Sequence, residues 1–389
     1  RLFVRYIGAP NAMNIRDIEA RTLDIPFRHH FKHHSADRSR TQALLVRTRT
    51  QNESIGFGEG CPREYVTNET LAGCLAFVEH HAAELAKSIH STNDLDAWID
   101  QHEHQINTNP AAWCAIELSL LDAISKDLGQ SIETTLGSPP LAGNFQYTAV
   151  LGDNSPTAFG QLVAQYVELG FGDFKVKITG EVQNDNEKLS LVRDAVPEAR
   201  IRLDANNIWE TVEEVSTYLH SLSVAPFALE EPLQPRAFDE LNRLLRTTSV
   251  PIILDESFLN IGHFDLIDTS QHNVIVNIRI SKMGGLMRAR SIARLLSDVG
   301  VPLIVGAQVG ETSLLTRAGL CLANEFKEYV IAQEGAFGTL LLETDVTNES
   351  LMFGSKGRLA CPGAGQAATV HGFEIRYKSD LFGSDASDS

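Results

Sequence analysis

The chain has 389 residues, with 33 Lys or Arg against 50 Asp or Glu, and its formal net charge is −17. This acidic balance argues against nucleic acid or an anionic membrane as the main partner, because both require basic surfaces. Apolar residues make up 43% of the chain, which favours a globular protein over a disordered one. No apolar run approaches the roughly 20 residues of a membrane span, and the length predicts two or three domains.

The five cysteines are odd in number and form no CxxC pair: Cys61, Cys74, Cys114, Cys321 and Cys361. We therefore expect reduced thiols in a cytoplasmic enzyme, without a zinc site. The first residues, RLFVRYIGAP, lack the apolar core of a signal peptide and begin at Arg1 instead of Met. We expect the natural start to lie further upstream.

The first 140 residues predict an α+β domain. Residues 15–60 are typical of a hairpin-like β segment with IGFGEG as its turn. Residues 70–137 keep apolar residues at three- and four-residue spacing, which predicts helices, and Gly129 stands at a C-cap position. The histidines in IPFRHHFKHHSADR (His29, His30, His33 and His34) fit no helical metal pair. We expect them in a loop that closes over the substrate.

Residues 141–344 change to short apolar strands that alternate with helices. Eight strand candidates recur about every 22–30 residues: QYTAVLG, FKVKI, RIRLDAN, FALEEP, PIILDES, VIVNIRI, VPLIVG and YVIAQEG. This period favours a (β/α)₈ barrel. An open doubly wound sheet is the alternative, but no GxGxxG follows the first strand. We expect residues 345–378 to return to the first domain and the acidic stretch 379–389 to be disordered.

Polar residues interrupt these strands on one face. Successive strand side chains point to opposite sides, so the alternation places the polar set inside the barrel, near the carboxyl ends of five consecutive strands, where barrel active sites lie. The inward residues expected there are Lys175, Lys177, Arg202, Asp204, Glu230, Asp255, Asn277 and Arg279.

Three converging carboxylates would repel one another unless a cation lay between them. Mg²⁺ prefers oxygen ligands and leaves positions open for water or substrate. We therefore predict that Asp204, Glu230 and Asp255 bind Mg²⁺. The alternative is a structural ion-pair network with the inward lysines and arginine, which explains a single pair better than it explains six residues in register.

The two lysines of FKVKI give the site its chemistry. A lysine acts as a base only without its proton, and a neighbouring ammonium and a nearby Mg²⁺ both disfavour the protonated form. A metal-bound carboxylate substrate would have an acidified α-proton. KxK alone is a weak signal; its position before the carboxylate series gives it weight.

These residues resemble the enolase superfamily, on its mandelate racemase/muconate lactonizing enzyme branch. The matching segments are FKVKI, RLDAN, LEEP, LDES and SKMGG, from about residue 15 to residue 375. The resemblance implies a modified barrel with an N-terminal capping domain, Mg²⁺ on the three carboxylates, and Lys177 as the base. It implies that Lys175 makes Lys177 easier to deprotonate and contacts the substrate carboxylate. The capping segments, including CPREYVT, would choose the substrate.

One position departs from the family pattern. The family's second catalytic lysine stands three residues before the lysine that precedes GG, and this chain has Arg279 there. A guanidinium stays protonated and cannot serve as a base. Arg279 could still stabilise an enolate or bind a carboxylate. Lys282 has the opposite strand parity, so we expect it to contact substrate and not to replace the missing base.

Further polar residues follow the strand ends. We expect Asn206, Gln308 and Glu334 to contact substrate, although Gln308, Glu311 and Glu334 could equally cap the following helices. Glu231 and Glu256 have outward parity and are interpreted as residues that support the metal ligands or pack in the helix layer, unless a twist of the strand end turns either toward the metal.

The first functional hypothesis is a Mg²⁺-dependent enzyme that removes the α-proton of a small carboxylate with one base, as an isomerase (cycloisomerase) or a lyase (dehydratase). A racemase or epimerase of amino-acid derivatives is the alternative within the family. Two further possibilities are a metal-free barrel lyase that forms a Schiff base at Lys177 and a non-catalytic carboxylate-binding relative. A homo-oligomer fits the family.

Overall fold

The computed structural model describes residues 13–33, 36–152, 155–361 and 371–382. Eight parallel strands form one curved sheet in sequence order. They are β7 (Ala149–Leu151), β8 (Asp173–Lys177), β9 (Arg200–Asp204), β10 (Ala228–Glu230), β11 (Ile252–Leu254), β12 (Val274–Arg279), β13 (Leu303–Gly306) and β14 (Val330–Gln333). A hydrogen bond of 2.8 Å from the Thr148 amide to the Gln333 carbonyl links the two ends of the sheet. All eight predicted strands and the barrel fold are therefore confirmed.

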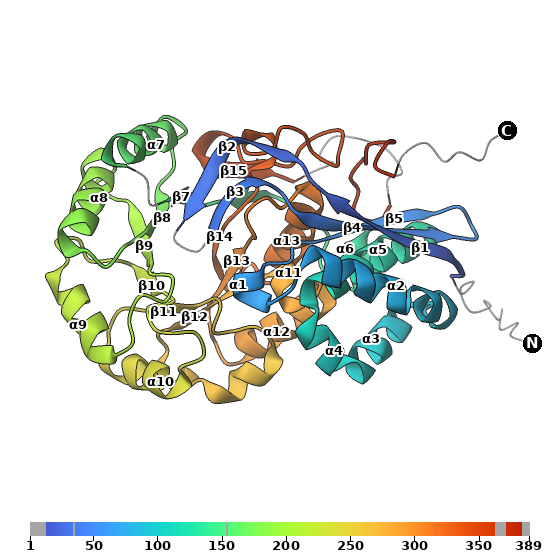
Figure 1. Ribbon diagram of the computed structural model, residues 1–389, viewed down its shortest axis with the longest axis horizontal. Coiled ribbons are helices and arrows are strands. Elements are labelled where there is room, and N and C mark those ends of the chain that lie inside the picture. Colours follow the sequence, from blue (N-terminus) through green and yellow to red (C-terminus); the bar gives the residue numbers. More distant parts are fainter. Residues whose placement is uncertain (1–12, 34–35, 153–154, 362–370, 383–389) are drawn as a thin grey trace, which may run out of the picture.

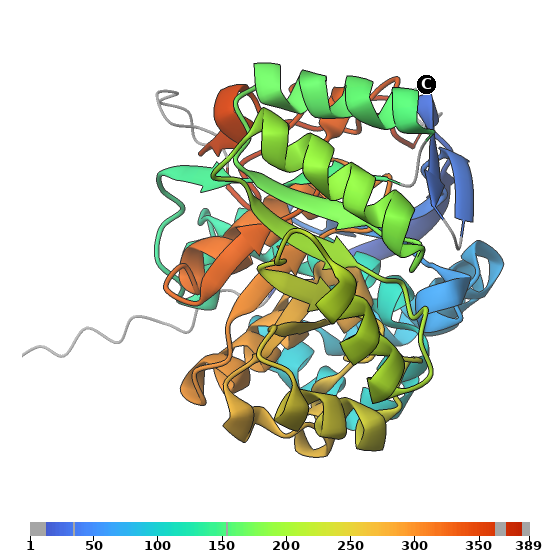
Figure 2. The ribbon, with the colours of Figure 1, turned by 90° about the vertical axis from the view of Figure 1, so that its left-hand side faces the viewer.

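Helices cover the outside of the barrel, as Figure 2 shows for α7 and α8. They are α7 (Pro156–Glu168), α8 (Val182–Ala195), α9 (Val212–Ser221), α10 (Phe238–Thr247), α11 (Ile280–Met283), α12 (Leu286–Asp298) and α13 (Ser313–Glu325). Among the described residues, two of the eight expected βα units lack an α-helix after the strand. Within the described chain, only the 3₁₀ turns η1 (Ile261–Leu266) and η2 (Thr269–Gln271) lie between β11 and β12, and the 3₁₀ turn η3 (Gly338–Leu340) is the first element after β14. Gly335 and Gly338, both with positive φ, interrupt the second of these segments.

The N-terminal part forms a cap beside the barrel (Figure 1). Its strands are β1 (Ile15–Leu23), β2 (Pro26–His33), β3 (Ala36–Arg40), β4 (Ala43–Thr50) and β5 (Ile55–Gly60), and its helices are α1 (Glu64–Thr67), α2 (Leu71–Ser88), α3 (Thr92–Gln101), α4 (Glu103–Thr108), α5 (Pro110–Asp127) and α6 (Ile132–Leu136). Strands β1, β4 and β5 form an antiparallel sheet, and β2 pairs with β3. Gly129, with φ of 66°, follows α5 as expected.

The segment IGFGEG is a strand and not the predicted turn. Gly56, Gly58 and Gly60 of β5 face the buried helix α5, and a Cβ at Gly58 would lie 2.0 Å from the Ala115 carbonyl oxygen. The glycines therefore serve close packing of a helix on a strand, and the turn lies at residues 51–54 instead.

Two other predictions for irregular segments need correction. His29, His30 and His33 lie in strand β2 and not in a loop, while His34 lies outside the described residues. The start of the predicted acidic tail is packed: the Phe382 ring lies 4.5 Å from the guanidinium carbon of Arg47. Residues 383–389 lie outside the described residues.

The last segment of the chain contacts both parts of the molecule. Strand β15 (Arg358–Ala360) pairs with β6 (Asn144–Gln146) beside the barrel. Further on, the Gly372 carbonyl accepts a hydrogen bond of 3.0 Å from the Ile132 amide in the cap. We propose the domain division 1–140, 141–344 and 345–378 with this shared third segment. No helix in the described ranges is long and apolar enough to cross a bilayer.

Two buried carboxylates fasten the cap to the barrel. Glu59 in β5 accepts hydrogen bonds from the amide of Thr312 (3.0 Å) and from its hydroxyl (2.6 Å), at the start of α13. Glu117 in α5 accepts one of 3.0 Å from the Met287 amide, at the start of α12. A carboxyl oxygen at a helix N-terminus accepts from amides that have no partner within the helix. The cap therefore binds the ends of two barrel helices.

We predict that Glu117→Gln makes stability less dependent on pH. Burial raises the pKa of Glu117 from its ordinary 4.5 to about 8, so the native state holds a proton that the unfolded chain releases above pH 4.5. Its contribution to the free energy of unfolding therefore falls as pH rises between these values. Between pH 5 and pH 8, urea unfolding should show the native chain losing on the order of 3 kcal/mol more than the variant. Equal losses would contradict this assignment.

Candidate active site

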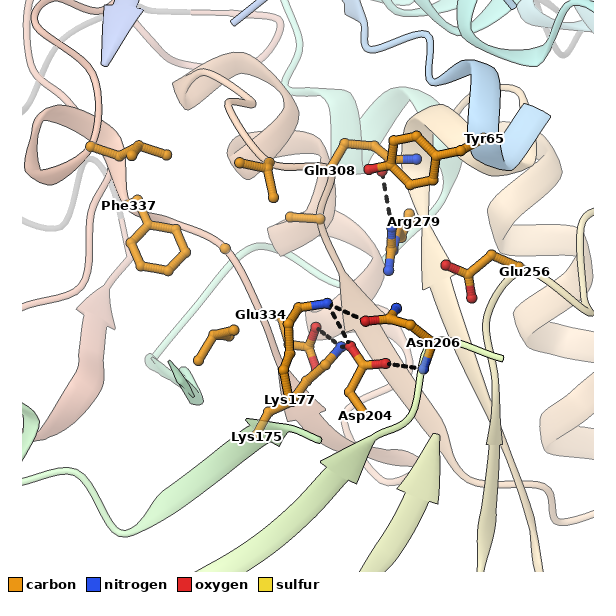
Figure 3. A pocket seen from close by; sticks show the side chains of 15 residues that line it. Tyr65, Lys175, Lys177, Asp204, Asn206, Glu256, Arg279, Gln308, Glu334 and Phe337 are labelled. Atoms are coloured by element: carbon orange, nitrogen blue, oxygen red, sulfur yellow. Dashed lines mark hydrogen bonds and ion pairs between the residues drawn. The ribbon is translucent and has the colours of Figure 1, made fainter. Parts of the chain in front are cut away.

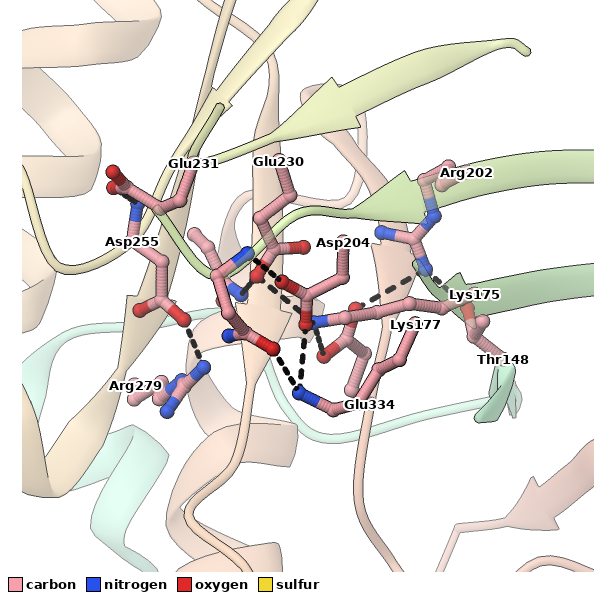
Figure 4. Close-up of polar contacts among 12 residues, drawn as sticks. Thr148, Lys175, Lys177, Arg202, Asp204, Glu230, Glu231, Asp255, Arg279 and Glu334 are labelled. Atoms are coloured by element: carbon pink, nitrogen blue, oxygen red, sulfur yellow. Dashed lines mark hydrogen bonds and ion pairs between the residues drawn. The ribbon is translucent and has the colours of Figure 1, made fainter. Parts of the chain in front are cut away.

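The carboxyl ends of the barrel strands bring together the inward polar residues. Just below them, one side chain from each of five strands forms an apolar layer separate from the main core: Ala228, Ile253, Ile275, Ile304 and Ala332. Glu230, Asp255 and Asn277 follow the first three of these at a spacing of two residues. The alternation predicted from the sequence is therefore observed, and it turns the polar residues toward one another (Figure 4).

Lys175 lies at the centre of this cluster. Its Nζ donates to Glu230 Oε1 at 2.8 Å and to Glu334 Oε2 at 3.0 Å, and lies 3.4 Å from Asp204 Oδ2. Burial disfavours the ammonium charge, but the three carboxylates outweigh it and the pKa of Lys175 is raised. Arg202 contacts the other oxygen of Glu334 at 3.3 Å. Lys175 is therefore a fixed cation shared among carboxylates.

Lys177, next along the same face of β8, reaches the cavity at the barrel mouth. Its Nζ lies 3.1 Å from Asp204 Oδ2 and donates to Asn206 Oδ1 at 2.7 Å. Burial of Asp204 is outweighed by Lys177 and Lys175, so the pKa of this carboxyl is lowered. Asn206 is held by its own amide, which donates to Asp204 Oδ1 at 3.2 Å. The structure thus brings these three predicted site residues together (Figure 3).

A second cluster surrounds Asp255 just beyond β11. Arg279 donates to Asp255 Oδ2 and, at 2.9 Å, to Gln308 Oε1. Lys282 donates to Asp255 Oδ1 at 2.7 Å and to the Asn277 carbonyl at 2.8 Å. The guanidinium of Arg279 and the amide of Gln308 both line the cavity.

Lys282 does not occupy the position expected of a substrate contact. Its side chain is 1% exposed and is not among the residues that line the cavity. The short helix α11 begins directly after β12 and turns Lys282 back toward the strand ends. Burial first, and then Arg279, lowers the pKa of Lys282 to about 7. Its hydrogen bonds indicate that it supports Asp255.

The two glutamates that follow proposed metal ligands take different places. Glu231 accepts from the Asp255 amide at 2.5 Å and from the Ser257 amide at 2.8 Å, which fixes the loop that carries Asp255. Glu256 lines the cavity. Burial and nearby carboxylates, Glu231 first, raise its pKa to about 8. Strand β11 ends at Leu254, so the strand alternation no longer applies at Glu256.

Neither the apolar lining of the cavity nor the hydrogen bond that Glu311 accepts could be predicted from the sequence. Tyr65, Val150, Val309, Phe337 and Leu341 line the cavity with the polar residues. Tyr65 lies in the segment CPREYVT, which was expected to choose the substrate without a particular residue being named. The other residues are apolar, and nothing in the sequence distinguishes them from core residues. Glu311 accepts from the Gln308 amide at 2.7 Å and closes that loop.

Comparison with known proteins identifies the family. A family model described as Enolase C-terminal domain-like matches residues 158–366, more than half of the chain. The chain belongs to the enolase superfamily. It lies on the mandelate racemase/muconate lactonizing enzyme branch, as its motifs predict.

Its relatives are racemases and epimerases. The N-succinyl-L-Arg/Lys racemase of Bacillus cereus is 25% identical over 338 residues, which cover 86% of this chain and 90% of the relative. The L-Ala-D/L-Glu epimerase of Bacillus subtilis is 26% identical over 359 residues, covering 90% and 95%. The structure of the dipeptide epimerase from Cytophaga hutchinsonii, complexed with Mg and D-Ala-L-Val, has a TM-score of 0.82 at 22% identity, covering 95% and 97%. An enzyme of the isomerase kind is thereby supported.

Asp204, Glu230 and Asp255 of this enolase-superfamily chain are suited to bind a divalent cation. Their oxygens are the right type of ligand, and one of these oxygens has no hydrogen-bond partner. Among the described residues no three His, Cys, Asp or Glu side chains are already grouped as metal ligands. Lys175 and Arg279 lie against these carboxylates instead. Glu230 Oε2, however, is buried without a hydrogen-bond partner. Such an atom is costly unless a cation or donor reaches it, and carboxylate oxygens are the ligands Mg²⁺ prefers.

We predict that Lys282→Met destabilises the fold. The substitution removes the Lys282 hydrogen bonds to the Asn277 and Asp255 carbonyls, of which the Asp255 carbonyl keeps the one from the Phe258 amide, and it removes a charge partner of the Asp255 carboxylate. The free energy of unfolding should fall by about 2–4 kcal/mol. Lys327→Met, at an exposed position, is the matched control and should change it by less than about 0.5 kcal/mol. Denaturant unfolding that shows no difference between the two variants would contradict a supporting role for Lys282.

Proposed function

We propose that this chain is a Mg²⁺-dependent enzyme that removes the proton α to the carboxylate of a small acid, with Lys177 as its only base. The arrangement of Lys177 and Arg279 supports this proposal. Both side chains line the same cavity, and Figure 3 places them at different walls. Lys177 can give and take a proton, whereas the guanidinium of Arg279 remains a cation.

Asp204, Glu230 and Asp255 would hold the metal. Mg²⁺ bound there would polarise the substrate carboxylate and stabilise the negative charge that develops when the α-proton leaves. Lys175, held protonated by its carboxylates, supplies a fixed positive charge beside the site. Asn206 orients the Lys177 amine through its 2.7 Å hydrogen bond. Lys177 must lose its proton before it can act as a base.

Arg279 distinguishes the possible outcomes. Racemisation or epimerisation with two bases needs a proton acceptor on each face of the α-carbon. With a cation opposite Lys177, the proton can leave and return on one face only, which favours a cycloisomerase or a β-eliminating lyase. Arg279 would then stabilise the enolate or bind a second carboxylate.

A racemase or epimerase of amino-acid derivatives is the second candidate. The names of the relatives favour it, because they act as racemases and epimerases. It would require a second proton donor besides Lys177. Glu256, which lines the cavity, has the chemistry for that role, although it follows β11 and not β12.

We predict that only one face of the α-carbon exchanges its proton. With Mg²⁺ in D₂O, N-acyl amino acids, dipeptides and hydroxy acids of both configurations should show α-deuterium incorporation, measured by mass spectrometry, from one configuration only. Lys177→Gln should abolish exchange. Arg279→Lys introduces a possible base on the second face and should add exchange of the other configuration. Equal exchange of both configurations by the native chain would favour the epimerase.

We predict that Mg²⁺ binding depends on Glu230. Glu230→Gln removes a charged ligand, so the Mg²⁺ affinity measured by calorimetry should fall roughly tenfold or more. Glu311→Gln is the control, because burial raises the pKa of Glu311 to about 8 and this group is mostly uncharged at neutral pH. EDTA should stop exchange and Mg²⁺ should restore it. Exchange that survives EDTA, with borohydride trapping of a carbonyl substrate on Lys177, would indicate Schiff-base chemistry instead.

A further inference from the structure

By their chemistry, the residues that line the cavity form a polar set and an apolar set, called the polar half and the apolar half of the lining. Val150 from β7, Val309 after β13, and Phe337 and Leu341 on either side of η3 form the apolar half. Figure 3 shows Phe337 across the cavity from Asn206 and Glu256. A substrate whose carboxylate lies among the cations of the polar half would therefore extend its remote end toward these apolar side chains.

An aromatic stack holds Phe337 in place. Its ring centroid lies 5.4 Å from that of Phe353 at 74°, and Phe353 contacts Phe171 at 5.2 Å and 90°. Edge-to-face contacts of this kind are favourable and leave little rotational freedom. Phe337 is only half-buried, although Phe353 packs on it from behind. It therefore presents a preformed apolar surface to the cavity.

The cap fixes the other side of the apolar half. The Leu341 carbonyl accepts a hydrogen bond of 2.7 Å from the Arg28 amide in β2, and the Glu343 amide donates to the Pro26 carbonyl at 2.9 Å. The segment that carries Phe337 and Leu341 is thus tied to the cap strand as well as to the barrel.

An ammonium group on a substrate, placed against this apolar surface, would find no free carboxylate nearby among the described residues that line the cavity. The carboxylates that line the cavity are Asp204, Glu256 and Glu334. Asp204 is engaged by the two lysines, Glu334 by Lys175 and Arg202, and Glu256 lies across the cavity from Phe337. An ammonium at the remote end of a substrate would lose its water without gaining a counter-ion, which is unfavourable, whereas an apolar group would gain by burial.

We propose that Phe337 determines specificity, and that it selects acids whose end remote from the carboxylate is apolar and uncharged. This inference rests on the proposed function, because the polar half is taken to bind the carboxylate. It names the class of acid: a small carboxylate with an aliphatic or aromatic tail, in preference to one with a cationic or anionic tail.

Binding of two acids that share the same carbon chain tests this proposal directly. Caproate and ε-aminocaproate differ only in the terminal ammonium, and their affinities for the Mg²⁺-loaded native chain can be measured by calorimetry. Caproate should bind at least about tenfold more tightly. Equal affinities, tighter binding of ε-aminocaproate, or no binding of caproate would each overturn the proposal.

Substitution of Phe337 tests whether this residue sets the preference between the two acids. Phe337→Asp places a carboxylate on the apolar surface and should reverse the preference, so that ε-aminocaproate binds at least about tenfold more tightly than caproate. Leu340→Asp is the matched control: it adds the same charge on η3, at a position that is 43% exposed and outside the cavity lining, and should leave the preference unchanged. If Phe337→Asp fails to fold, Val309→Asp should shift the preference in the same direction. An unchanged preference in the folded variant would overturn the role assigned to this surface.

The two proposals can fail separately. Exchange of α-deuterium by acids with polar and apolar tails alike would support the proposed function and overturn the specificity. A tenfold preference for caproate without α-exchange of any acid would support the specificity and contradict the proposed function.

Discussion

Neutralisation of carboxylates at the strand ends is the constraint on which this site depends. Parallel strands with inward polar residues bring Asp204, Glu230 and Asp255 to the same end of the barrel, and their charges are unfavourable in a buried site unless cations lie among them. Lys175 provides one such cation and Arg279 another. The unpaired Glu230 Oε2 indicates that these two do not satisfy every oxygen. A metal ion and a free amine on Lys177 are the proposed completion of this arrangement.

The cap contributes to the site through buried glutamates that bind the barrel helices and through strand pairing. Glu59 and Glu117 bind the N-termini of α13 and α12, and strand β2 binds the segment that follows η3. Tyr65 of α1 reaches the cavity from the cap. The surfaces proposed to contact the remote end of a substrate are therefore built jointly by cap and barrel, while the proposed reacting groups come from the barrel. This division agrees with a superfamily whose members share chemistry and differ in substrate.

The sequence predicted the barrel well because strand alternation and the βα period are local signals. Lys175, Asp204 and Glu230 could be assigned to the interior from parity alone. Strand parity does not assign side chains where a strand ends, as at Glu256 and Lys282, because the turn that follows decides their direction. The prediction of a turn at IGFGEG was wrong, because the glycines allow helix α5 to approach the strand. Phe337 could not be found, since an aromatic residue after a strand looks the same whether it faces a core or a cavity.

The relatives of this chain are named racemases and epimerases, whereas Arg279 cannot act as a second base. The role of Arg279 depends on where the metal and the substrate bind. Diffraction from crystals grown with Mn²⁺ in place of Mg²⁺ and an unreactive carboxylate would locate the metal by its anomalous signal and the carboxylate by its electron density. We predict one metal peak bounded by Asp204, Glu230 and Asp255, with the α-carbon of the ligand between Lys177 and Arg279. A peak elsewhere, or a ligand whose α-carbon lies out of reach of the Lys177 amine, would contradict this prediction.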